Sequence, residues 1–242
     1  MNLSKFALLF VVFVDVVGQG IILPIINALI MNPQAGFMPT GTSQSARHFN
    51  FGLVIAVFYL SWFLGAVYVS KLSDSIGRKN GMLLCLAGAL LGYLLTILAI
   101  AQGSLLLMLL GRVVTGFTAG NQPIAQAAMV DLSQSDAEKT RNLGYVVSAL
   151  SVGLIAGPLI AGVLSDQGLL GGFASLSLPF YFAMGLVVIA ISLILFSFED
   201  KLAVRAPLRL KPTEVFLLLW QVKGHPTVLR LAAAYFFFMF VW

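Results

Sequence analysis

Two residues of opposite charge, Asp15 and Arg112, each stand within a long run of apolar residues. An ionised side chain in the middle of a membrane costs at least about 2.5–3.5 kcal/mol, so such residues are retained where they pair or face water. A carboxylate there can take up and release a proton, and movement of a nearby guanidinium changes the balance between its two protonation states. Asp15 and Arg112 are therefore candidates for proton coupling. A static buried pair that fixes helix packing is the alternative.

Four uncharged amides accompany these charges. Gln19 lies one helical turn after Asp15 on the same face, and the others are Asn121, Gln122 and Gln126. Amides in an apolar environment are costly unless they are hydrogen-bonded. We therefore expect these four side chains to line a polar substrate cavity, with hydrogen bonds between helices as the alternative.

The composition places all of these residues in a membrane protein. Of the 242 residues, 60% are apolar and 10% are charged, against about 45–50% and 25% in soluble domains. The mean hydropathy of +0.99 agrees. The net charge is +5, but too few charged residues remain for a phosphate-binding face, so nucleic acid is excluded as a partner.

Six apolar stretches are long enough for helices that cross a membrane, which takes about 20 residues each. They are residues 6–30, 50–70, 80–101, 105–130, 143–164 and 176–198. We predict an all-α membrane protein with a six-helix transmembrane bundle over residues 1–198. Residues 228–242 are read as the truncated start of a seventh helix, so we expect that a C-terminal half is missing.

Residues 199–227 are predicted to form a basic cytoplasmic linker. Thr213 can cap a short amphipathic helix that ends near Trp220 and lies on the membrane surface; a plain tether is the alternative. With the N-terminus in the cytoplasm, twelve of the 14 lysines and arginines lie on the cytoplasmic side. The positive-inside rule therefore predicts this orientation in a cell inner (plasma) membrane.

A short sequence recurs in the two halves of the bundle. Leu72-Ser73-Asp74 follows the second span and Leu164-Ser165-Asp166 follows the fifth, on opposite predicted sides of the membrane. This placement fits a 3+3 inverted repeat, in which the first and fourth spans correspond. Chance recurrence of a common turn sequence is the alternative.

Two segments carry residues suited to conformational gating. In the loop after the second span, Gly77 permits a turn with positive φ, and Arg78 can bind a carboxylate, for which Asp131 is a candidate. Anchoring by positive charge alone is the alternative. The fifth span combines small residues with a proline, which suits either a bending or sliding helix or static packing. The gating candidates are Asp74, Gly77, Arg78, Lys79 and Asp131, and in the fifth span Gly153, Gly157, Pro158 and Gly162.

No enzyme is expected. The two histidines, His48 and His225, lie in predicted loops on opposite sides of the membrane, and the single cysteine, Cys85, lies in an apolar span. The sequence shows no nucleophile–base pair, phosphate-binding loop or metal-ligand spacing. We therefore expect neither a metal nor a cofactor.

At these motifs the chain resembles the major facilitator superfamily of secondary transporters. The loop resembles the family signature GxLaDrxGrk, from which Ser70 and Ser75 depart, and the fourth span resembles RxxxGxxxG. The fifth span resembles the antiporter pattern gxxxGPxxGG. The first span is similar to that of drug/proton antiporters, including the tetracycline exporters. The matching residues are Asp74, Gly77, Arg78 and Lys79; Arg112, Gly116 and Gly120; Gly153, Gly157, Pro158 and Gly162; and Asp15, Gly18, Gly20 and Pro24.

The resemblance implies the first six of twelve helices in a two-domain transporter, with the substrate bound between the halves. It implies proton-coupled export of a small organic compound, with small-molecule substrate, protons, lipid bilayer and the missing half as partners. The proton gradient would supply the driving force. Proton-coupled uptake of a nutrient, chelator or metabolite is one alternative, and a membrane interaction module that transports nothing is another.

Overall fold

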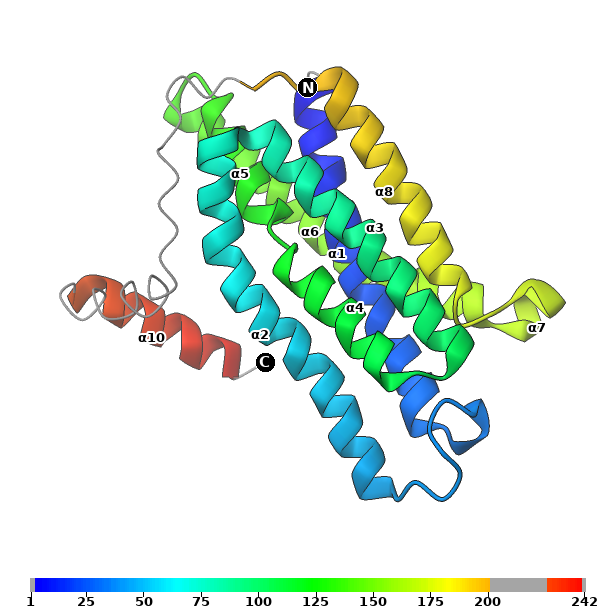
Figure 1. The fold of residues 1–242 in the computed structure, drawn as a ribbon. Coiled ribbons are helices and arrows are strands. Elements are labelled where there is room, and N and C mark those ends of the chain that lie inside the picture. The colour runs from blue at the N-terminus through cyan, green and yellow to red at the C-terminus, as the bar shows by residue number, and fades with distance from the viewer. Residues whose placement is uncertain (1–2, 201–225, 241–242) are drawn as a thin grey trace. The chain divides into compact units, whose positions relative to one another are not determined.

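The computed structural model describes residues 3–200 and 226–240, and these residues contain helices but no strands (Figure 1). Contacts divide the chain into two units, residues 1–206 and 207–242. The predicted linker helix falls outside the described residues. In the second unit a helix, α10, runs over Pro226–Phe240, where the sequence predicted the start of a seventh span.

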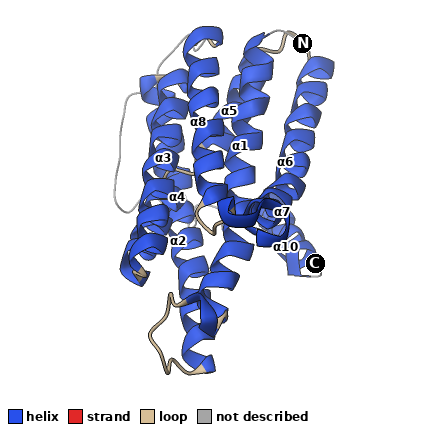
Figure 2. Ribbon diagram, turned by 90° about the vertical axis from the view of Figure 1, so that its right-hand side faces the viewer, coloured by secondary structure: helices blue, strands red, loops and turns tan. Residues whose placement is uncertain are grey.

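The first unit is a helical bundle (Figure 2). Its elements are α1 (Leu3–Ile26, continued by a π-helical turn over Asn27–Met31), α2 (Gln44–Ile76), α3 (Arg78–Gln102), α4 (Leu105–Phe117), α5 (Asn121–Asp131), α6 (Asp136–Ser165), α7 (Gln167–Leu170) and α8 (Leu178–Ser197). Five of them, namely α1 with its π-helical turn, α2, α3, α6 and α8, are long and apolar enough to cross a membrane. These five match five of the six predicted spans.

The fourth predicted span is not one helix. The expectation of a continuous helix over residues 105–130 is wrong, because α4 ends at Phe117 and α5 begins at Asn121. Pro123 explains the break, since it has no N–H to donate to the carbonyl of Ala119. The indole N–H of Trp62 donates to that carbonyl instead, over 2.9 Å. Figure 1 shows the turn between the two half-helices.

The helix contacts have the symmetry of the predicted inverted repeat. α1 packs on α6 and α8, while α4 packs on α2 and α3. If the first three spans correspond to the last three, the α1–α6 pair corresponds to α4–α2, and α1–α8 corresponds to α4–α3. The packing therefore supports a 3+3 arrangement.

Glycines allow the backbones of α1 and α6 to approach closely. A Cβ added to Gly157 would lie 2.7 Å from the Cα of Gly20, and one added to Gly153 would lie 2.9 Å from the carbonyl oxygen of Phe13. Pro158 also lies against Gly20, whereas Gly162 has open space around it. Three of the four residues singled out in the fifth span thus form its contact with α1.

Candidate functional site

The structure brings the two buried charges, Asp15 on α1 and Arg112 on α4, to the same cavity. Tyr93 of α3 also lines this cavity, together with Gln19 and Phe58. The space amounts to about 20 Å³, which is room for about one water molecule. The site is therefore a small chamber within the bundle, lined by ionisable, polar and apolar side chains.

Asp15 and Arg112 form no ion pair within the described part of the chain. Oδ2 of Asp15 and Nε of Arg112 are buried without a hydrogen-bond partner. The guanidinium of Arg112 lies over the ring of Phe58, 4.1 Å from its centroid, a cation–π contact that stabilises the cation away from water. The carboxylate oxygen thus remains available to a proton or a water molecule.

The break in the fourth span places a further polar group at this site. Asn121, the first residue of α5, is fully buried and its amide lies beside the Asp15 carboxyl. Neither polar atom of the Asn121 amide has a hydrogen-bond partner among the described residues. The N-terminus of α5, whose backbone N–H groups favour negative charge, therefore lies next to the carboxylate.

The predicted amides are not gathered in one cavity. Gln19 lines the chamber and also a second space of about 30 Å³, which shares Phe58 and Arg112 with the first. Gln122 and Gln126 are partly exposed on α5 and line neither space. Of the four amides, only Gln19 and Asn121 therefore lie near the buried charges.

Sequence reasoning missed the aromatic members of the site. The hydroxyl of Tyr93 lies directly against Gly18, where any side chain would collide with it, and Phe58 carries the guanidinium of Arg112. A tyrosine in the middle of an apolar span is a usable signal, because its hydroxyl requires a polar neighbour. Nothing in the sequence marks Phe58 among the many phenylalanines of the chain.

The sequence predicted a loop after the second span, but the connection between α2 and α3 is Gly77 alone, and charged residues of both helices hold this turn. Arg78 forms ion pairs with Asp74 and with Asp131, in the second case with 3.5 Å between Nε and Oδ2. Gly77 has a φ of +101°, and Lys79 donates to the carbonyl of Leu195 at 2.8 Å. The loop is thereby joined to the ends of α5 and α8.

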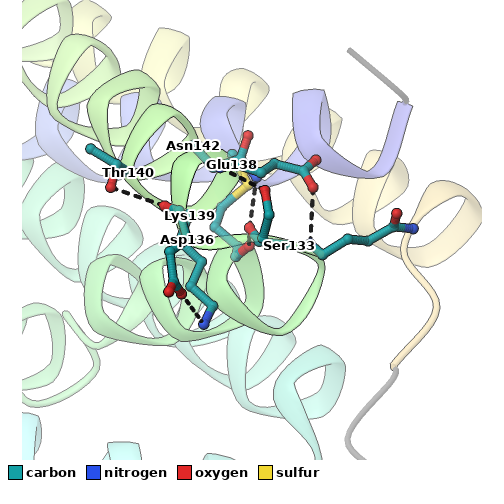
Figure 3. A network of polar contacts seen from close by, with 9 residues as sticks. Ser133, Asp136, Glu138, Lys139, Thr140 and Asn142 are labelled. Carbon is teal, nitrogen blue, oxygen red and sulfur yellow. Dashed lines mark hydrogen bonds and ion pairs between the residues drawn. The ribbon is translucent and has the colours of Figure 1, made fainter.

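A second polar cluster, not anticipated from the sequence, lies at the start of α6 (Figure 3). Ser135 caps the helix by accepting from the N–H of Glu138, while Glu138 accepts from the N–H of Gln134 at 2.9 Å. The Ser-x-x-Glu spacing is that of a capping box, but the glutamate here accepts from the residue before the cap instead of from the cap residue itself. Lys5 of α1 donates to Glu138 at 2.6 Å, so the cap also joins α1 to α6.

The cluster continues along α6. The amide of Asn142, which is buried, donates to the hydroxyl of Ser133 over 2.8 Å. Lys139 and Asp136 form an exposed ion pair of 2.9 Å. Figure 3 shows these contacts gathered around the turn that leads into α6.

The bundle has the architecture of secondary transporters. Three features define it: inverted-repeat packing, an interrupted helix, and ionisable groups around small internal cavities. The chain belongs to the Major Facilitator Superfamily, whose family model matches residues 6–242. Members of this family are transporters and not enzymes. The family prediction made from the motifs is therefore confirmed.

The most informative relatives are resistance proteins. The chain is 31% identical to the class B tetracycline resistance protein of Escherichia coli over 201 residues, which cover 83% of this chain and 45% of the relative. It is 27% identical to the quinolone resistance protein NorA of Staphylococcus aureus over 238 residues, covering 97% and 56%. The chain thus spans about half the length of the curated relatives it matches.

A solved structure has the same fold. The crystal structure of the human organic anion transporter TETRAN superposes with a TM-score of 0.69 and 22% identity, over 88% of this chain and 52% of that one. At this identity the similarity shows the fold alone.

Proposed function

We propose that the protein containing this chain is a proton-coupled exporter of a small organic compound that works by alternating access. The observation that carries the proposal is the buried, unpartnered Oδ2 of Asp15 in a chamber with room for about one water molecule. Resistance proteins against tetracycline and quinolones are among the relatives, which supports export of a drug-like, partly apolar compound.

In this proposal Asp15 is the proton-coupling group. Asn121 and the N-terminus of α5 stabilise the ionised carboxylate, while Arg112 keeps its charge over Phe58. Displacement of α5 relative to α1 would remove this stabilisation and favour the protonated form. Proton binding and release at Asp15 would thus be linked to the position of a half-helix.

The gating roles follow from the contacts at the ends of the bundle. Arg78 would hold the α2–α3 loop to α5 through Asp131 in one conformation and release it in the other. The substrate would bind near the chamber, against a second six-helix half that the family architecture calls for. The protein would lie in the plasma membrane with its N-terminus in the cytoplasm, as the distribution of positive charge predicts.

The test uses the complete protein reconstituted in lipid vesicles with an imposed pH gradient. Asp15→Asn keeps the shape of the side chain but cannot cycle a proton, so we expect proton-driven flux to be lost while downhill substrate exchange persists. Asp166→Asn is the matched control, because Asp166 only caps the short helix α7, and it should transport normally. Unchanged proton-driven flux in Asp15→Asn would refute the proton-coupling role.

The direction of transport is measured in the same vesicles. Export predicts that substrate moves against the direction of proton flow. Movement of substrate with the protons would support the uptake alternative instead.

A further inference from the structure

Tyr93, on α3, is a buried tyrosine in a helix that is long and apolar enough to cross a membrane. Its ring packs against that of Phe180 of α8, with 6.2 Å between the ring centroids. Neither this ring nor lipid can solvate a hydroxyl group, so the hydroxyl of a tyrosine buried here requires a polar neighbour elsewhere. The direction in which the hydroxyl points identifies that neighbour.

The hydroxyl of Tyr93 points at α1. It occupies the space that a side chain at position 18 would fill, since a Cβ added to Gly18 would overlap the hydroxyl and lie 2.8 Å from Cζ of the ring. Gly18 follows Asp15 by three residues, so the two share one face of the helix. Gly18 thus leaves room for a tyrosine hydroxyl on the face of α1 that carries the Asp15 carboxyl.

The charged groups of the chamber can hold one water molecule between them. Oδ2 of Asp15 and Nε of Arg112 are buried without a hydrogen-bond partner among the described residues, and the chamber that both residues line has room for about one water molecule. The carboxylate can only accept hydrogen bonds and the guanidinium can only donate them. A water molecule can join the two, because it donates to the carboxylate and accepts from the guanidinium.

Tyr93 offers this water a further partner. Its hydroxyl makes no direct hydrogen bond within the described part of the chain, and a phenol can both donate and accept. Thr115 and Thr118 also line the chamber, but their hydroxyl protons are already donated to backbone carbonyls, at 2.9 and 2.8 Å. Gln19 lines both this chamber and the second space. The hydroxyl of Tyr93 is therefore the group on α3 that can bond to a water molecule beside Asp15.

We propose that Tyr93 is a positioning residue for Asp15: its hydroxyl, together with Asp15 and Arg112, binds one water molecule in the chamber and so orients the carboxyl for proton exchange. The inference rests on the proposed function only in assigning the coupled proton to Asp15. The hydrogen bonds themselves require no transport, so they can be measured separately from flux.

Infrared difference spectroscopy measures the hydrogen bonding of the carboxyl directly. Spectra of the complete protein in phosphatidylcholine nanodiscs are taken at acidic and at neutral pH, and the C=O stretching band of protonated Asp15 is the one that Asp15→Asn lacks. Tyr93→Phe removes the hydroxyl alone, so we expect this band to move to higher wavenumber as the carboxyl loses its hydrogen-bonded water. The O–H band of the bound water, identified by its shift in isotopically labelled water, should disappear. Tyr181→Phe is the matched control, because Tyr181 is 56% exposed on α8, and it should leave both bands in place.

A second variant reaches the same hydroxyl from α1. In Gly18→Ala the methyl group displaces the hydroxyl of Tyr93, so we expect the same shift of the carboxyl band. Combined with Tyr93→Phe it should add little, because both substitutions remove the same hydrogen bond. In the vesicle assay each variant should reduce proton-driven flux about two- to tenfold more than downhill exchange. A defect of structure alone would reduce the two rates alike.

The single cysteine of the chain reports whether the variants fold. Cys85 is completely buried, so its thiol becomes accessible to N-ethylmaleimide only when the bundle opens. Each variant is heated in steps with the reagent, and labelling of the Cys85 peptide is read by mass spectrometry. Tyr93→Phe should label at nearly the temperature of the unmodified protein, and it carries the test even if Gly18→Ala does not fold.

Three results would overturn the inference. The first is a carboxyl band that stays in place in Tyr93→Phe or moves as far in Tyr181→Phe, or a bound-water band that persists in Tyr93→Phe. The second is a pair of shifts in Gly18→Ala and Tyr93→Phe that add in the double variant. The third is the absence of any carboxyl band that depends on Asp15, which would contradict the proposed function as well. If the band shifts as expected but Asp15→Asn retains proton-driven flux, the proposed function fails and the role of Tyr93 stands.

Discussion

The indole N–H of Trp62 donates to the carbonyl of Ala119 across 2.9 Å, at the point where Pro123 withholds the helical donor. This hydrogen bond between α2 and the turn after α4 replaces one that a continuous helix would have made within itself. The interruption that places Asn121 beside Asp15 is thus held by a residue from another helix.

Removal of this donor is expected to destabilise the bundle. Trp62→Phe leaves the Ala119 carbonyl unpartnered, and we expect a loss of about 1–3 kcal/mol in the free energy of unfolding. In a Pro123→Ala background the restored N–H can bond to that carbonyl, so the same substitution should cost less. The double-mutant cycle is measured by denaturant-dependent labelling of the buried thiol of Cys85 with N-ethylmaleimide. The loss in free energy of unfolding in the double variant should be smaller than the sum of the losses in the two single variants. Additive effects would show that the two groups do not share the carbonyl.

Two glycines of α6 are expected to respond in opposite ways to the same substitution. In Gly157→Ala the added methyl group meets the backbone of α1 at 2.7 Å, and the overpacking should cost about 1–3 kcal/mol. In Gly162→Ala the methyl group meets open space, and the better helix propensity should leave stability equal or raised by about 0.5–1 kcal/mol. Thermal labelling of Cys85 measures both. A harmless Gly157→Ala would contradict the close contact of α1 and α6.

The Lys5–Glu138 ion pair can be tested by exchanging its charges. Its side chains are 13% and 22% exposed, so Lys5→Glu alone should lower the free energy of unfolding through repulsion of the two carboxylates. Lys5→Glu combined with Glu138→Lys restores the attraction. Recovery should be partial, because lysine at position 138 cannot accept from the N–H of Gln134. A double variant less stable than Lys5→Glu would argue against the pair.

Arg78 is expected to matter more for stability than an exposed lysine of the same charge. Arg78→Gln leaves both Asp74 and Asp131 without their cation, and we expect a loss of about 0.5–1 kcal/mol, since both carboxylates are partly exposed. Lys139→Gln breaks a pair whose aspartate is 96% exposed and should change the free energy of unfolding very little. Equal effects in the same denaturation experiment would mean that Arg78 does not join the loop to α5.

Hydropathy predicted five of the membrane-crossing helices, because length and apolarity are properties of each segment by itself. It failed at the fourth span, where apolar residues continue across the break and conceal it. Pro123 was the available signal. The donor that replaces the N–H of residue 123, the indole of Trp62, lies on another helix, so the fourth span by itself does not reveal it.

The site was predicted only in part, because the sequence reveals properties of single segments and not the packing between them. A charge within an apolar span can be recognised without a structure, so Asp15 and Arg112 were found, and the structure places them at one chamber. The partners depend on the packing of separate helices, which periodicity does not encode. Tyr93 and Phe58 were missed for that reason, and Gln122 and Gln126 do not line the chamber.

The two contacts between α1 and α6, the Lys5–Glu138 ion pair and the close approach of the glycines, also bear on how the bundle can move. Since α1 contacts α6 through an ion pair near one end and through glycines farther along, we expect the two helices to tilt together. The two helices would then move as one rigid unit. Bending would occur elsewhere in the bundle, most readily at the break between α4 and α5.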